Sequence, residues 1–202
     1  CDGNYLFLDI HHIVADGTSL GIILNDINRA YSGEKLEVEE YTSYDLALDN
    51  RDALASDAYK NAENYYKSVF ENAGGSINFY PDKSGAAPTA EMYHRETSEF
   101  SVQDVKAFCK KHGITENVFF ISAFGITLGK YNFRKDAVFT TIYHGRNDSR
   151  LSDTVGMLVK TLPVYCDFSG STADCLNAVQ QQLINSMNND IYPFSQISHE
   201  FN

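Results

Sequence analysis

The stretch that decides the fold class is YLFLDIHHIVADG, residues 5–17, close to the start of a chain of 202 residues. Its first part, Tyr5–Ile10, is apolar and follows Gly3-Asn4, which predicts a buried β-strand. Over 20–31 the apolar residues recur at the spacing of an amphipathic helix. The sequence therefore predicts a strand, a tight turn and a helix, with two histidines at the end of the strand.

Helices and strands are mixed along the rest of the chain. Periodicity and turn residues predict helices within 41–48, 52–73, 101–113, 115–131, 171–187 and from Pro193 onwards, and strands at 93–100, 137–144 and 161–168. Residues 74–91 contain five Gly or Pro residues among small and polar ones, which predicts a connection between two units. The fold class expected is α/β, of the α+β type.

Composition and charge narrow the class of protein. Apolar residues make up 43% of the chain and charged residues 21%, which is typical of a folded domain. The net charge of −11 disfavours a nucleic-acid partner, because this charge repels a phosphate backbone. No apolar stretch is long enough to cross a bilayer, so no membrane partner is expected.

The cysteines indicate a cellular compartment, and the start of the chain indicates whether it is part of a longer polypeptide. Four cysteines without Cys-x-x-Cys spacing are too few for a disulfide scaffold, which favours a reducing compartment and a cytoplasmic location. The chain opens on Cys-Asp-Gly, without an initiator Met or a signal-peptide pattern. We therefore expect it to be a piece of a longer polypeptide.

The dense cluster of reactive side chains lies between His11 and Gly17. Adjacent strand residues point to opposite faces, so one imidazole of the pair can face a cleft while the other faces the core. An imidazole in a cleft can accept or share the proton of a nucleophile that attacks an acyl group. Asp16 can hold the turn by a charge-assisted bond, and Gly17 permits a positive φ.

Other interpretations of this cluster use the same residues. Both histidines can be structural residues at a strand end. A metal site is disfavoured and none is predicted, because side chains on opposite faces are poor joint ligands and no Cys or Glu at ligand spacing completes a shell. A serine hydrolase is disfavoured as well, because the chain contains no Gly-x-Ser-x-Gly turn.

The residues resemble a known family, the condensation domains of nonribosomal peptide synthetases, which are relatives of chloramphenicol acetyltransferase. The family's His-His-x-x-x-Asp-Gly motif is complete in His11, His12, Asp16 and Gly17. Further matches follow in the family's order: Tyr41–Asp45, Gly145-Arg146, Val155–Pro163 and Pro193-Phe194. Two residues depart from the family's pattern, Ser43 in place of Asp and Lys160 in place of Asn.

The resemblance implies a two-lobe architecture like that of chloramphenicol acetyltransferase. Residues 1–73 would be the end of the N-terminal lobe, 74–91 the connection, and 92–202 most of the C-terminal lobe. The family's early motifs and closing segment have no counterpart in this sequence. We therefore expect the isolated chain to be inactive.

The resemblance also implies a function in the synthesis of peptide antibiotics and other secondary metabolites. Donor and acceptor peptidyl carrier domains would present their substrates on 4'-phosphopantetheine arms, beside an adenylation domain, and an amide bond would form without a bound cofactor. His12 would be the catalytic residue, as a base or by orienting the amine. The site would be supported by His11, Asp16, Gly17 and Arg146, and the substrate channel would include Gly156, Lys160 and Thr161.

Two alternatives and one geometric expectation complete the hypothesis. A stand-alone acyltransferase that uses coenzyme A is a relative of the same fold, although the motif at 155–163 favours a synthetase. A non-catalytic docking module is the other alternative. Asp16 and Arg146 are expected to form an ion pair that ties the histidine turn to the strand ending at His144, with carboxylate and guanidinium about 2.7 to 3.2 Å apart.

Overall fold

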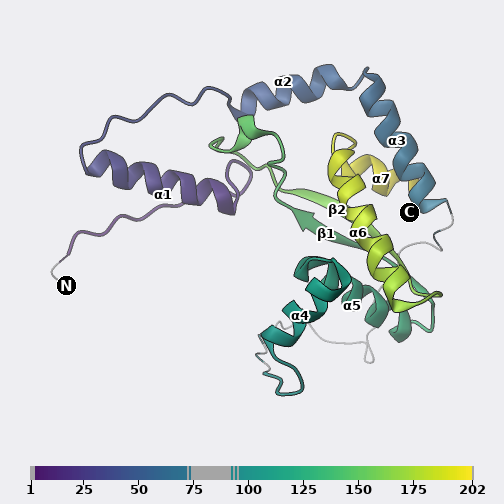
Figure 1. Cartoon of the computed structure of the whole chain (residues 1–202). Helices are drawn as coiled ribbons and strands as arrows, with labels where there is room; N and C mark the ends of the chain where they lie inside the picture. The colour runs from purple at the N-terminus through teal and green to yellow at the C-terminus, as the bar shows by residue number, and fades with distance from the viewer. Residues whose placement is uncertain (1–2, 72, 74–91, 93, 95, 202) are drawn as a thin grey trace, which may run out of the picture. The chain divides into compact units, whose positions relative to one another are not determined.

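A computed structural model describes residues 3–71, 73, 92, 94 and 96–201 (Figure 1). The predicted connection at 74–91 lies outside the described residues, and the assignment of the flanking residues to two lobes stays a prediction. The elements in chain order are α1 (Gly17–Tyr31), α2 (Ser43–Ala53), α3 (Asp57–Phe70), α4 (Val102–His112), α5 (Glu116–Tyr131), β1 (Asp136–Tyr143), the 3-10 helix η1 (Ser149–Leu151), β2 (Lys160–Asp167), α6 (Thr172–Asn188) and α7 (Phe194–Phe201).

The chain packs as two compact units that alternate along the sequence. Within the described residues, the first unit takes 3–65, 142–162 and 187–194, and the second takes 66–71, 73, 92, 94, 96–141, 163–186 and 195–201. Strands β1 and β2 form a two-stranded sheet. They run antiparallel, because Phe168 N donates to Lys135 O at one end while Gly145 lies against Leu158 at the other.

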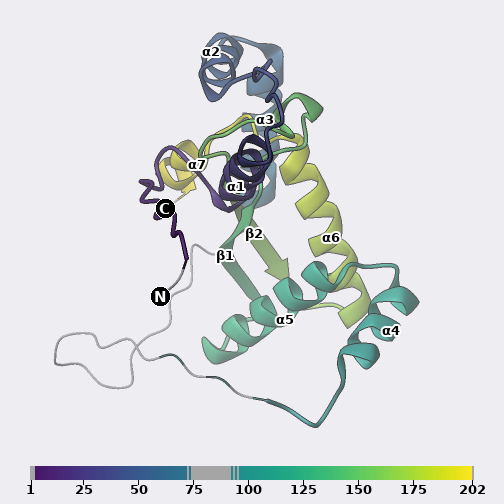
Figure 2. The same ribbon diagram turned by 90° about the vertical axis from the view of Figure 1, so that its left-hand side faces the viewer.

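The core of the second unit depends on a close approach between α5 and the strands, which lie side by side in both views (Figures 1 and 2). A Cβ atom at Gly125 would lie 2.8 Å from the Cβ of Cys166 on β2 and 2.9 Å from the ring of Phe139 on β1. Only a glycine lets the helix backbone come this near. The same Cys166 side chain also contacts α6, with its Sγ 3.5 Å from the Sγ of Cys175.

Local sequence signals explain where the helices begin and end. In α4, the Ser101 hydroxyl caps the Asp104 N–H and the Asp104 carboxylate accepts from Ser101 N at 2.7 Å, so the predicted capping box is present. Gly113 ends the same helix in the left-handed conformation, at φ 64°. The predicted helix at 52–73 begins later, at Asp57, because the Ser56 hydroxyl caps the Tyr59 N–H.

Two predicted strands do not form. Residues 4–10 have no regular structure, and the side chains of Tyr5, Leu6, Phe7 and Leu8 are exposed. A strand requires a neighbour that completes its hydrogen-bond ladder, and within the described residues the only ladder joins β1 to β2. The described residues of 93–100 are likewise coil and bends.

In the part of the chain that the structure describes, no helix combines the length and apolar character needed to cross a bilayer.

Candidate functional site

The two histidines lie in a tight turn that leads into α1. Val14 N donates to His11 O at 3.1 Å, and Ile13 N donates to His11 Nδ1 at 3.1 Å. Both imidazoles are exposed, so the prediction that one of them faces the core is wrong for this conformation. The alternation of faces on which it rested belongs to a strand, and the chain forms a turn here.

The Asp16 carboxylate begins α1 and holds the turn. It accepts a hydrogen bond from Ser19 N at 2.8 Å, so Asp16 is the N-cap of the helix. Gly17 is therefore the first helical residue and does not have a positive φ, contrary to the sequence-based expectation. The left-handed glycine of the site is Gly145, at φ 68°, where a Cβ atom would overlap the carbonyl oxygen of Leu158.

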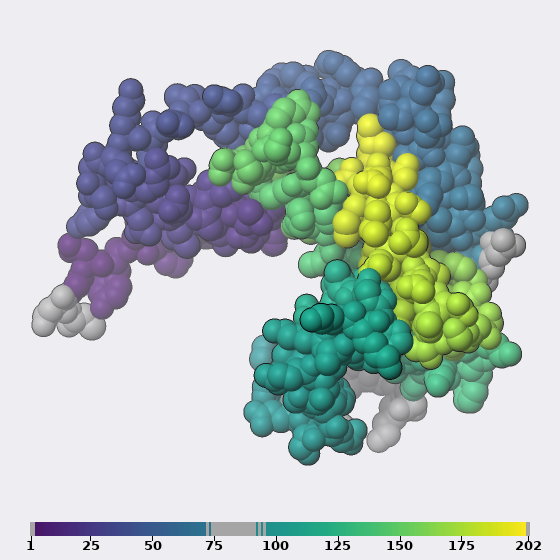
Figure 3. Space-filling view, viewed as in Figure 1, coloured from purple at the N-terminus to yellow at the C-terminus, as the bar shows by residue number. Residues whose placement is uncertain are grey.

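The ion pair expected between Asp16 and Arg146 is present. Arg146 Nη2 lies 3.1 Å from Oδ1 and 3.3 Å from Oδ2 of Asp16, and the two side chains are 6% and 1% exposed. Arg146 Nη1 donates to the carbonyl oxygens of Leu151 and Thr154, each at 2.7 Å. The guanidinium thus joins the histidine turn to the loop that precedes β2. In the space-filling view the green segment before β2 lies against the purple segment that contains α1 (Figure 3).

Asp16 stays charged although it is buried. Burial by itself raises the pKa of this carboxyl, but hydrogen bonds from the backbone and side chain of Ser19, from Leu158 N at 3.1 Å and from Arg146 outweigh it. The balance lowers the pKa of Asp16 to about 2, from an ordinary value of 3.8. A permanent negative charge therefore lies four residues after His12.

Sequence reasoning missed Ser19, which is completely buried. Its Oγ lies 2.8 Å from Asp16 Oδ1 and 2.8 Å from Gly156 O, and it accepts from Gly156 N at 3.0 Å and from Arg146 Nη2 at 3.2 Å. One signal in the sequence was available: Asp16 and Ser19 stand at the N-cap and N3 positions, where side chains and backbone of a helix start exchange hydrogen bonds.

The three residues expected in the channel are placed differently from one another. Gly156 contacts the histidine turn, because its carbonyl oxygen accepts from Asp16 N at 3.2 Å. Lys160 Nζ instead lies 3.0 Å from the carboxylate of Asp190 and donates to the Asp190 carbonyl at 3.1 Å. Thr161 is the second residue of β2 and is partly buried.

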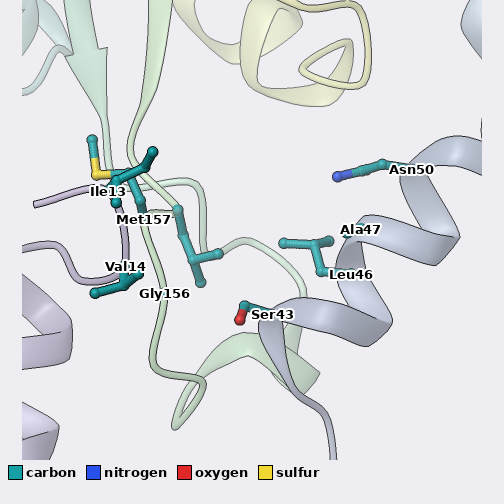
Figure 4. Close-up of a pocket in the computed structure, with 9 residues that line it drawn as sticks. Ile13, Val14, Ser43, Leu46, Ala47, Asn50, Gly156 and Met157 are labelled. Carbon is teal, nitrogen blue, oxygen red and sulfur yellow. The ribbon is translucent and has the colours of Figure 1, made fainter.

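A pocket of about 320 Å³ lies beside the histidine turn, within the first unit (Figure 4). Residues from one face of α2, from the histidine turn and from the loop before β2 line it: Ile13, Val14, Ser43, Leu46, Ala47, Asn50, Gly156, Met157 and Leu158. Thr154 Oγ1 donates to Tyr41 O at 2.6 Å, just before α2, and Arg150 Nη1 lies 3.1 Å from Asp49 within α2. These two contacts hold the loop to α2. Ile13, which lines the pocket, is the residue directly after His12 in the sequence.

The His12 imidazole faces solvent. Its side chain is exposed, and none of the described residues forms a hydrogen bond with it. The turn that carries His12 is held by the buried hydrogen bonds of the Asp16 carboxylate with Ser19, Leu158 and Arg146. The imidazole of His12 thus lies on a turn whose Asp16 end is held in place.

Curated proteins resemble this chain in sequence over nearly its whole length. Bacitracin synthase 2 of Bacillus licheniformis is 28% identical over 199 residues, which are 95% of this chain and 8% of that protein. Tyrocidine synthase 3 of Brevibacillus parabrevis is 27% identical over 201 residues, 96% of this chain and 3% of that protein.

Solved structures show the same fold. The first condensation domain of the calcium-dependent antibiotic synthetase, in complex with a substrate analogue, matches with a TM-score of 0.75 at 17% identity, over 96% of this chain and 45% of that one. A four-domain nonribosomal peptide synthetase bound to AMP and glycine matches with a TM-score of 0.76 at 20% identity, over 93% of this chain and 15% of that one. The chain therefore spans less than half of these relatives. The condensation domain sequence family matches residues 2–202, and this chain belongs to that family.

Proposed function

We propose that this chain is part of a domain that joins a carrier-bound acyl thioester to a carrier-bound amine in nonribosomal peptide synthesis. The observation that carries the proposal is the complete histidine motif, in which the buried pair of Asp16 and Arg146 holds the turn and leaves His12 exposed. Membership of the condensation domain family supports it.

The reaction needs little from the protein beyond positioning and one proton transfer. The acceptor amine attacks the carbonyl carbon of the donor thioester, a C–N bond forms, and the C–S bond breaks to release the thiol of the donor's phosphopantetheine arm. The nitrogen loses one proton on the way and the sulfur of the leaving arm gains one, so the proton count closes. His12 is suited to accept that proton, or to orient the amine by a hydrogen bond, because a neutral imidazole does both near neutral pH.

The other residues of the motif serve as supports in this proposal. Asp16 and Arg146 fix the turn, Gly17 begins the helix behind it, and His11 closes the turn by accepting the Ile13 N–H. We place Gly156, Lys160 and Thr161 along the path of the substrates. They belong to one segment, which contacts the first turn of α1 at Gly156 and continues into β2.

The partners follow from the reaction. Donor and acceptor peptidyl carrier domains deliver the two substrates on 4'-phosphopantetheine arms, and an adenylation domain loads a carrier. The relatives support this assignment, because they are named as synthetases of bacitracin and tyrocidine and one solved relative is a four-domain synthetase.

The test is amide formation by a complete condensation domain that contains these 202 residues. Loaded donor and acceptor carriers are mixed with the domain, and the product on the acceptor carrier is measured by mass spectrometry. Product formation well above the uncatalysed background is expected. Transfer from an acyl coenzyme A to a free amine would favour the stand-alone acyltransferase, and carrier binding without turnover would favour a docking module.

We propose further that the 202-residue chain does not condense substrates by itself. It spans 45% of a solved condensation domain, and the segment at 4–10 exposes its apolar side chains where a fold would cover them. The isolated chain with both loaded carriers should give product at the background rate. Turnover comparable with that of the complete domain would contradict this.

A further inference from the structure

The buried hydroxyl of Ser19 uses its full hydrogen-bonding capacity. A serine hydroxyl can donate one hydrogen bond and accept two. The Ser19 Oγ accepts from Gly156 N and from Arg146 Nη2, and its one proton lies between two acceptors at equal distances of 2.8 Å, Asp16 Oδ1 and Gly156 O. Since Ser19 has no exposed surface, water cannot replace any of these partners.

The peptide unit of Gly156 is held by the first turn of α1 on both sides. Its N–H donates to Ser19 Oγ at 3.0 Å, while its carbonyl oxygen accepts from Asp16 N at 3.2 Å and lies 2.8 Å from Ser19 Oγ. Two residues further on, Leu158 N donates to Asp16 Oδ2 at 3.1 Å. Ser19 and Asp16 together thus set the position of residues 156–158 against the histidine turn.

These contacts exceed what the start of a helix requires. A residue that only caps α1 would bond within the first turn, as the Asp16 carboxylate does with Ser19 N. Ser19 bonds in addition to both backbone polar groups of a residue that is 137 positions away. The segment it holds contributes Gly156, Met157 and Leu158 to the pocket beside Ile13 and Val14 (Figure 4).

We propose that Ser19 is a positioning residue for condensation: its hydroxyl sets the distance between the turn that carries His12 and the 156–158 segment. The proposal rests on the proposed function, because the two parts matter together only if substrates react between them. Removal of the hydroxyl leaves the Gly156 N–H and one Arg146 N–H without an acceptor in a buried place. The segment then shifts to satisfy them, and a shift of about 1 Å can cost about 100-fold in rate.

The experiment compares three variants of the complete domain that contains these residues. Ser19→Ala removes the hydroxyl, Ser19→Thr keeps it, and Ser32→Ala is the matched control at the other end of α1, where the exposed Ser32 hydroxyl donates to Asn28 O at 2.9 Å. The measurements are kcat and KM for amide formation from loaded carriers, together with hydrogen exchange of the Gly156 and Leu158 amides.

Ser19→Ala is expected to lower kcat by about 10- to 100-fold with a nearly unchanged KM for either carrier, and to speed exchange at Gly156 and Leu158. Ser19→Thr should restore kcat to within a few-fold of wild type, and Ser32→Ala should match wild type. If Ser19→Ala does not fold, Ser19→Cys decides, because it leaves no cavity and replaces the hydroxyl by a weak hydrogen-bonding group.

Wild-type kcat in a folded Ser19→Ala domain, or in Ser19→Cys where alanine is not tolerated, would overturn the positioning role alone. A loss that Ser19→Thr does not restore would overturn it too. A wild-type domain that forms no amide would overturn the proposed function, and with it this role.

Discussion

The carboxylate of Asp16 and the guanidinium of Arg146 lie 3.1 Å apart although 130 residues separate them in the sequence. The pair is almost completely buried, so each charge depends on the other and on the neighbouring backbone groups. It joins the N-terminus of α1 to the loop before β2. The pair therefore stabilises the fold and the histidine turn at once.

Arg146→Met should lower the free energy of unfolding of the complete domain by about 3 to 5 kcal/mol, because it leaves the buried Asp16 charge without its partner. Arg150→Met is the control: Arg150 pairs with Asp148 at 2.7 Å, but its side chain is 54% exposed, so the expected loss is about 1 kcal/mol or less. Urea unfolding measures both. Equal small losses would show that the buried pair does not hold the turn.

The Asp16 carboxyl should make stability depend on pH. Its pKa in the folded chain is about 2, below the ordinary value of 3.8, so the stabilisation is fully present above about pH 4 and is lost as the pH falls towards 2. A shift of this size corresponds to about 2 kcal/mol. The difference in unfolding free energy between wild type and Asp16→Asn should shrink by about that amount over this range, and a difference independent of pH would contradict the assignment.

Gly145→Ala should destabilise the domain more than Gly33→Ala. Both glycines have a positive φ, 68° and 83°, which disfavours alanine by about 1 to 2 kcal/mol. Only at Gly145 would the added Cβ also overlap the Leu158 carbonyl, whereas at Gly33 nothing lies within 4 Å. Thermal unfolding of the two variants tests this. Similar melting temperatures would mean that the backbone at Leu158 can move to accommodate the added Cβ without loss of stability.

Sequence signals predicted the features that depend on neighbouring residues or on a complete motif. The capping box of Ser101 and Asp104 is local, and it forms as expected. The Asp16–Arg146 pair was predictable from the order of the motifs, and it also forms. The mixed helix and strand content is confirmed by the fold.

Features that depend on distant partners outside the recognised motifs were not predictable. The apolar pattern of Tyr5–Ile10 indicates a strand, but a strand needs a neighbour and the described residues offer none. Gly17 looked like the flexible residue of the turn, yet the Asp16 cap makes it helical and Gly145 turns the chain instead. The role of Ser19 depends on Gly156, which is 137 positions away in the sequence.

The most direct test of the account is amide formation by the complete domain with His12→Ala, measured as single turnover between loaded carriers. The rate should fall by about 10² to 10⁴-fold, the range for a lost acid–base group, while the unfolding transition stays close to that of wild type. His199→Ala, which removes an exposed imidazole from α7 in the second unit, should leave the rate unchanged. A folded His12→Ala domain that forms the amide within a few-fold of the wild-type rate would contradict the central claim.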